Sequence, residues 1–139
     1  MTTSRSKAAI RIAAAVVVDP DGKVLLVRKR GTAAFMQPGG KIASHESAAE
    51  ALAREIEEEL GCAVDGAPRR LGTFYAPAAN EPDTDVQAEL FAVVLTGDIR
   101  IAAEIEEAVW HDPSEDSDLH LAPLTRTHVL PLVQSVGLG

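Results

Sequence analysis

The stretch GKIASHESAAEALAREIEEELGC, from Gly40 to Cys62, decides the fold of this 139-residue chain and carries most of its recognisable chemistry. Ser47 followed by Glu50 has the spacing of a capping box, which predicts that a helix begins here. Gly61 predicts the end of that helix after Leu60, because glycine readily takes the left-handed conformation common at helix C-termini.

The apolar side chains of this helix fall on one stripe when successive residues are placed about 100° apart, and we expect that stripe to be buried. Its members are Ala49, Leu52, Ala53, Ile56 and Leu60.

Glutamates occupy the neighbouring face of the helix. Glu55, Glu58 and Glu59 stand at i, i+3 and i+4, whereas Glu50 and Glu57 point further round towards solvent. Like charges at this spacing repel, and a divalent cation is the simplest remedy, since carboxylates are hard ligands suited to Mg²⁺ or Mn²⁺. The alternative at this point is a solvated acidic surface helix.

The whole stretch resembles the Nudix box, G-x5-E-x7-R-E-U-x-E-E-x-G-U, where U is a bulky aliphatic residue. Cys62 departs from the last aliphatic position, and we expect only a change in packing because cysteine behaves as a small hydrophobe. Seven specified positions, each matched by chance about once in fifteen, give on the order of 10⁻⁸ per starting point. The matching residues are Gly40, Glu46, Arg54, Glu55, Ile56, Glu58, Glu59 and Gly61.

This resemblance implies an α/β fold, a Nudix-type α/β/α sandwich with a mixed sheet, formed by a single domain over residues 1–139. It implies Mg²⁺-dependent hydrolysis, by metal-activated water, of a pyrophosphate bond in a nucleoside diphosphate linked to another moiety. Mn²⁺ is the expected substitute metal, and no covalent protein nucleophile is expected.

The resemblance also implies roles for individual residues. Arg54 would orient the glutamates through charge-assisted hydrogen bonds, with Glu46 in support or as a further ligand. Glu55 is also the candidate base. The implied metal ligands are the carbonyl of Gly39 and the carboxylates of Glu55, Glu58 and Glu59.

Members of the family often add one more glutamate from a later loop. We assign that role to Glu104, which lies six residues before Trp110 as in MutT-type proteins. Glu89 and Glu107 are the alternatives.

Substrate contacts are expected outside the box. Arg28, in the basic cluster 28–30, and Lys41 are candidates for phosphate contact, with a solvated surface role as the alternative for each. Phe74 or Tyr75 would stack on a base, and Asn80 lies in the same segment.

Two substrate classes remain open. The PGGK segment looks MutT-like and suggests nucleoside triphosphates, whereas Pro77, 15 residues after Cys62, resembles ADP-ribose-type members or simply shapes its loop.

The segments before the box predict a hairpin. Residues 10–18 form a buried strand, 19–22 a turn and 23–28 a second strand, and Pro38-Gly39-Gly40 must be a loop.

After the box, residues 70–75, 86–95 and 106–111 predict strands. Residues 124–133 predict a helix that Pro131 ends or kinks.

Composition limits the partners. The net charge of −8 disfavours duplex nucleic acid, whose phosphates attract basic proteins, but allows a small nucleotide bound with a metal. The single cysteine suits a reducing compartment, residues 1–19 lack a signal-peptide cleavage pattern, and no apolar run could span a membrane. We therefore expect a cytoplasmic protein.

Three other functions compete with the hydrolase. A catalytically silent Nudix-fold nucleotide sensor is disfavoured because the box glutamates are intact. Isopentenyl diphosphate isomerase is disfavoured because its catalytic cysteine lies before the box, and residues 1–39 here contain no cysteine. A nucleic-acid-binding protein is disfavoured by the acidic net charge. Relatives in the resembled family are often homodimers, which leaves a small-molecule substrate and a second copy of the chain as the expected partners.

Overall fold

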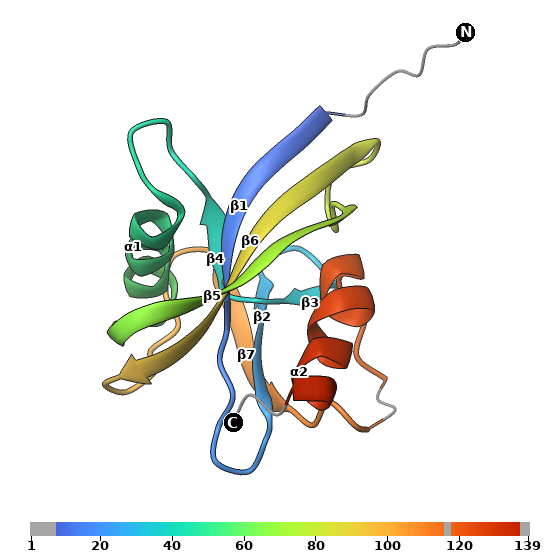
Figure 1. Cartoon of the computed structure of the whole chain (residues 1–139). Coiled ribbons are helices and arrows are strands. Elements are labelled where there is room, and N and C mark those ends of the chain that lie inside the picture. The colour runs from blue at the N-terminus through green and yellow to red at the C-terminus, as the bar shows by residue number, and fades with distance from the viewer. Residues whose placement is uncertain (1–7, 116–117, 137–139) are drawn as a thin grey trace, which may run out of the picture.

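The computed structural model describes residues 8–115 and 118–136. Two helices flank the strands on opposite sides, as Figure 1 shows. The order of elements is β1 (Ala8–Val16), β2 (Val24–Lys29), β3 (Phe35–Met36), β4 (Gly39–Lys41), α1 (Ala48–Leu60), β5 (Ala63–Pro77), β6 (Thr84–Thr96), β7 (Ile105–His111), the π-helix η1 (Thr125–Val129) and α2 (Leu130–Val136).

The strands form two sheets. The first has the order β4-β1-β6-β5 and is mixed, since β1 runs parallel to β6 while the other pairs are antiparallel. The second has the order β3-β2-β7 and is antiparallel. The expected mixed α/β architecture is confirmed.

Strand β1 is buried on both faces over residues 13–16, which explains the apolar run at its C-terminal end. Ala13 and Ala15 pack in one core with Leu52 and Ile56 of α1. The alternate residues of β1, Ala14 and Val16, pack in a second core with Val129, Leu130 and Val133 from η1 and α2. Because successive strand residues face opposite sides, one strand serves both cores and produces the sandwich.

The predicted hairpin between the first two strands is wrong beyond its turn. The turn itself forms, with the Gly22 N–H donating to the Asp19 carbonyl at 2.9 Å, but only Val18 and Val24 bridge across it. Both edges of β1 are already taken by β4 and β6, so β2 enters the second sheet instead.

The predicted loop over residues 38–40 is also wrong, because Gly39 begins β4 on the edge of β1. Gly39 has φ +147°, and a Cβ on it would lie 2.1 Å from the carbonyl oxygen of Ala13. Glycine therefore permits a close strand approach here, in addition to the turn conformations expected from it.

The C-terminal helix is longer than expected. Pro131 does not end it, since α2 runs to Val136. Immediately before the proline, the Leu130 N–H donates to the Thr125 carbonyl five residues back, which is the π-helical pattern. Pro131 therefore lies inside a continuous helical run, directly after a π-helical stretch, and does not break that run.

The remaining predicted strands are confirmed as parts of β5, β6 and β7. None of the described helices has the length and apolar content that a bilayer span requires. Residues 1–7, which contributed to the expectation about a signal peptide, lie outside the described residues.

Candidate active site

Helix α1 begins and ends as its sequence predicts. The Ser47 side chain accepts a hydrogen bond from the Glu50 N–H, and the Glu50 side chain accepts one from the Ser47 N–H. At the other end Gly61 takes the left-handed conformation, with φ +67°. Both caps set the position of the glutamates between them.

The buried face of α1 is rotated from the predicted stripe towards those glutamates. Leu52, Ile56 and Leu60 are fully buried as expected, but Ala51 is buried and Ala53 is exposed. Glu59 is buried as well. The cause is β4, which packs beside the glutamate side of the helix and covers it.

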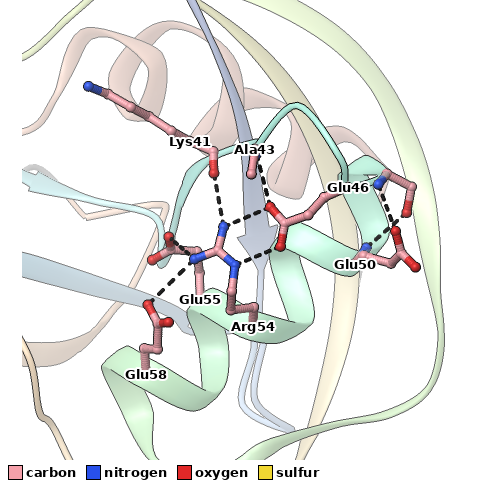
Figure 2. Close-up of polar contacts among 8 residues, drawn as sticks. Lys41, Ala43, Glu46, Glu50, Arg54, Glu55 and Glu58 are labelled. Atoms are coloured by element: carbon pink, nitrogen blue, oxygen red, sulfur yellow. Dashed lines mark hydrogen bonds and ion pairs between the residues drawn. The ribbon is translucent and has the colours of Figure 1, made fainter.

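Arg54 is the centre of a polar network (Figure 2). Its Nε and Nη2 donate to the two carboxylate oxygens of Glu46 at 2.6 and 2.8 Å. Its Nη1 donates to Glu55 at 2.9 Å and lies 3.5 Å from a carboxylate oxygen of Glu58. Its Nη2 also reaches the backbone carbonyl of Lys41 at 3.2 Å, while the Lys41 side chain points away from the network. One guanidinium thus contacts three carboxylates and the end of β4.

The electrostatic consequence is clearest at Glu46. The hydrogen bonds from Arg54, and then the N–H of Ala43, lower the pKa of Glu46 to about 2. The same carboxylates raise the pKa of Arg54 above its already high value, first through Glu46 and then Glu55. Both partners are held in their charged forms.

Glu59 is the most enclosed of the helix glutamates. Its side chain accepts a hydrogen bond from the Gly39 N–H at 3.2 Å. Burial and the neighbouring Glu55 carboxylate raise the pKa of Glu59 well above its usual range. The hydrogen bond from Gly39 and the charge of Lys29 lower the pKa and offset this only in part. A buried carboxylate beside a second carboxylate is a place where added positive charge is stabilising.

Gly40 gives Glu55 the room it occupies. A Cβ on Gly40 would lie 2.5 to 2.9 Å from the carboxylate atoms of Glu55. Glu58, in contrast, has a side chain that is 53% exposed, and Glu50 and Glu57 lie at the surface as predicted.

Within residues 8–115 and 118–136, no three His, Cys, Asp or Glu side chains are already gathered as a metal cluster. The contacts explain this arrangement: Glu55 is turned to Arg54, Glu59 to the Gly39 N–H, and Glu58 is only loosely held. The three carboxylates nevertheless occupy one side of the helix, next to β4.

A cleft that is open to solvent at its mouth adjoins this glutamate group. Its apolar wall comes largely from the α2-facing side of the first sheet and the segment before η1. Gly39 and Gly40 line the cleft and also contact Glu59 and Glu55, so the two glycines form the border between cleft and carboxylates. The apolar side chains include Ile10, Ile12, Met36, Val86 and Leu124.

Two predicted substrate residues, Lys41 and Asn80, line this cleft, as does Pro77. Sequence reasoning missed Lys29 and Gln37, which line it too. The basic cluster 28–30 pointed to the right segment, but alternation along β2 decides which of its members faces the cleft.

Arg28, Phe74 and Tyr75 are not brought to the cleft. Arg28 donates to Glu107 and to the Thr32 carbonyl, and its guanidinium lies 5.9 Å from the centre of the Phe35 ring. Phe74 packs in the second core, with its ring centre 5.3 Å from that of His128. Tyr75 is 59% exposed on β5.

The three candidates for a further glutamate occupy different surroundings. Glu104 is exposed and lies 3.9 Å from Lys29, the lysine that lines the cleft. Glu107 pairs with Arg28. Glu89 is buried on β6, where hydrogen bonds from Arg70 and Thr73 outweigh burial and lower its pKa. Of the three, only Glu104 has an ion pair with a cleft residue among the contacts of the described chain.

Comparison with known proteins identifies related chains. The NUDIX domain family model matches residues 9–132. An uncharacterized Nudix hydrolase of Bacillus subtilis is 30% identical over 110 residues, which are 77% of this chain and 69% of that protein. An ADP-ribose pyrophosphatase of Methanocaldococcus jannaschii is 26% identical over 99 residues, and the match spans 69% of this chain but 58% of that protein.

The solved structures give the same fold. A MutT NUDIX hydrolase from Burkholderia pseudomallei superposes with a TM-score of 0.72 at 23% identity, over 92% of this chain and 98% of that one. This likeness concerns the arrangement of the chain.

Proposed function

The chain belongs to the Nudix family, and from that premise we propose that it hydrolyses a pyrophosphate bond in a nucleoside diphosphate derivative, using a divalent metal. One observation carries the proposal: the carboxylates of α1 adjoin a largely apolar cleft across two glycines. Clefts with apolar walls and a few polar groups are typical small-molecule sites.

The residues fit a magnesium ion. Glu55, Glu58 and Glu59 offer hard oxygen donors, and the buried Glu59 beside Glu55 leaves negative charge insufficiently balanced. The Gly39 carbonyl is the proposed backbone ligand. A bound divalent cation would neutralise pyrophosphate charge and lower the pKa of a water.

The protein's own groups have distinct tasks in this proposal. Arg54 holds Glu55 in place and keeps Glu46 ionised, so the carboxylates are oriented before substrate arrives. Glu55 is the proposed base. Glu104, which pairs with Lys29 at the cleft, is the proposed additional acid.

The cleft suggests how a nucleotide is oriented. Its apolar wall accepts a flat base, and Lys29 and Lys41 are the positive groups that line it. With the base inside, the diphosphate would pass Gly39 and Gly40 towards the carboxylates. Asn80, on the segment after β5, remains a proposed substrate contact, whereas Arg28, Phe74 and Tyr75 would require movement to reach a ligand there.

Two substrate classes fit this arrangement, namely ADP-ribose-like compounds and nucleoside triphosphates. The first is the activity named for the Methanocaldococcus relative, of which the match spans just over half. The experiment is phosphate, pyrophosphate and nucleotide analysis after incubation with ADP-ribose, NADH, diadenosine polyphosphates, dNTPs and 8-oxo-dGTP. Each reaction is run with Mg²⁺, with Mn²⁺ and with EDTA.

Metal-dependent cleavage of one compound supports the hydrolase and identifies its class. Glu58→Gln serves as the inactive comparison, so that a contaminating activity is recognised. Binding without cleavage of any compound would favour the alternative, a nucleotide sensor on the same fold.

We also propose that the protein works in the cytoplasm, since its single cysteine, Cys62, is free and buried and suits a reducing compartment. We propose a homodimer only because members of the family are often homodimers. Size-exclusion chromatography with light scattering tests that assembly.

A further inference from the structure

A buried amide in the cleft has a hydrogen-bond partner for its oxygen but none for its nitrogen among the described residues. Gln37 is 5% exposed and lies between β3 and β4 among the residues that line the cleft. Its Oε1 accepts a hydrogen bond from the Thr125 hydroxyl at 2.8 Å. Its Nε2 has no hydrogen-bond partner among the described residues. Buried polar groups are normally paired, so this amide nitrogen marks a place where an acceptor is missing.

The hydrogen bond from Thr125 engages the oxygen end of the amide. Thr125 is fully buried at the start of η1 and also lines the cleft. By donating to Oε1 it leaves the NH₂ group, which can donate but not accept. Both side chains are buried, so they belong to the floor of the cleft and not to its rim.

We propose that Gln37 selects nucleobases that present a carbonyl oxygen to the cleft floor, and disfavours those that present an amino group there. This inference rests on the proposed nucleotide site and deepens it. The clearest case is a 6-oxopurine such as hypoxanthine or guanine against a 6-aminopurine such as adenine.

The geometry of the amide explains the direction of the preference. A glutamine that recognises adenine uses its oxygen to accept from the amino group and its nitrogen to donate to a ring nitrogen. Here Thr125 already occupies the oxygen, so that paired arrangement is hindered. An amino group at the floor would face the NH₂ of Gln37, donor against donor, whereas an oxo group would complete its hydrogen bonding.

The surrounding wall strengthens this discrimination. Ile12, Val86 and Leu124 line the same cleft and provide no alternative polar partner. A base that leaves a buried donor unpaired in apolar surroundings loses affinity, which is how polar sites reject near-isosteric ligands.

The test measures binding of IMP and AMP by calorimetry in EDTA, because these probes differ at the purine 6-position and neither requires turnover. We expect IMP to bind at least tenfold more tightly than AMP. Gln37→Met, a near-isosteric apolar change, should remove the preference mainly by weakening IMP. Thr125→Val should reduce it by freeing the amide to rotate and offer its oxygen.

Gln134→Met is the matched control, since Gln134 is an exposed glutamine of α2 outside the cleft lining. Thermal unfolding of each variant shows that it is folded. Equal affinity for IMP and AMP, preference for AMP, absence of binding, or an equal loss for both ligands in Gln37→Met would each overturn the proposal. Because binding is measured without metal, an IMP preference stands even if no pyrophosphate is cleaved, and cleavage without the preference rejects this inference alone.

Discussion

At the scale of single residues, Glu46 influences the glutamates of α1 although it lies before the helix in the sequence. It accepts two hydrogen bonds from Arg54, and Arg54 in turn holds Glu55. Glu46 therefore acts on the site by fixing a guanidinium, although it contacts none of the three clustered glutamates in the network described.

We expect Glu46→Gln to reduce kcat by about 10- to 100-fold, the range typical when a supporting partner of a metal ligand is removed. The amide cannot accept two charge-assisted hydrogen bonds from Arg54. Steady-state kinetics check this, and Glu50→Gln is the control, since Glu50 caps the helix without contacting Arg54. An unchanged kcat would show that Arg54 keeps its position unaided.

The same pair predicts a pH dependence of stability. The folded-state pKa of Glu46 is about 2, below its ordinary value of 4.5. Ionised Glu46 therefore stabilises the fold above about pH 4.5, and this contribution is lost as the pH falls towards 2. Urea unfolding should show Glu46→Gln less stable than the parent at pH 7, with the difference shrinking below pH 4.5. A difference that stays constant across this window contradicts the assignment.

The helix glutamates give a third prediction. Glu58→Gln and Glu59→Gln should each lower kcat by at least about 100-fold, because each removes a charged oxygen facing the proposed metal. Neither should reduce stability much, since Glu58 is exposed and burial disfavours the charged form of Glu59. Glu57→Gln, on the solvent side, should leave kcat unchanged. Equal activity in all three variants would refute the assignment of helix faces.

At the scale of elements, α1 and β4 form the site together, and two adjacent glycines make their contact possible. Gly39 brings β4 against β1, while Gly40 leaves space for Glu55. A Cβ added at Gly39 would meet backbone atoms of the neighbouring strand, whereas a Cβ added at Gly40 would meet the end of the flexible Glu55 side chain.

Alanine at these two positions should therefore separate folding from activity. Gly39→Ala should destabilise the protein by about 2 kcal/mol or more, because backbone atoms must move. Gly40→Ala should change the melting temperature little but lower kcat, because Glu55 must turn aside. Gly66→Ala is the control for positive φ alone, since its Cβ would meet open space at φ +75°. Similar melting temperatures for the Gly39 and Gly66 variants would contradict the steric argument.

The elements also show what sequence could and could not predict. Helix α1 is recognisable because its caps and periodicity are local. Its caps are confirmed, and its buried face is confirmed at Leu52, Ile56 and Leu60 but not at Ala53. The strand at Gly39 is not, since its formation depends on the free edge of β1, a partner more than 20 residues away. For the same reason two side chains of the cleft, Gln37 and Lys29, escaped prediction, since strand pairing places them there. Phe74, a plausible stacking residue by type, packs instead in the second core.

At the scale of the whole molecule, one sheet separates two cores and its β4 edge joins two functions. The cleft lies on the side of the sheet that faces α2, and the carboxylates lie on the side that faces α1. A ligand that spans both must pass the β4 edge, where Gly39 and Gly40 border the two regions. Metal and nucleotide should consequently reinforce one another's binding.

Thermal unfolding tests this coupling. Mg²⁺ at 100 times its Kd should stabilise the protein by about 2.7 kcal/mol, because it binds the folded carboxylates and not the unfolded chain. IMP added with Mg²⁺ should raise the melting temperature further than the sum of the two separate shifts. Glu59→Gln should remove the Mg²⁺ shift while Glu57→Gln retains it, because Glu59 lies at the border with the cleft and Glu57 is exposed on the solvent side of α1. Additive shifts would mean that the cleft and the carboxylates bind their ligands independently, and the β4 edge would then separate the two sites without coupling them.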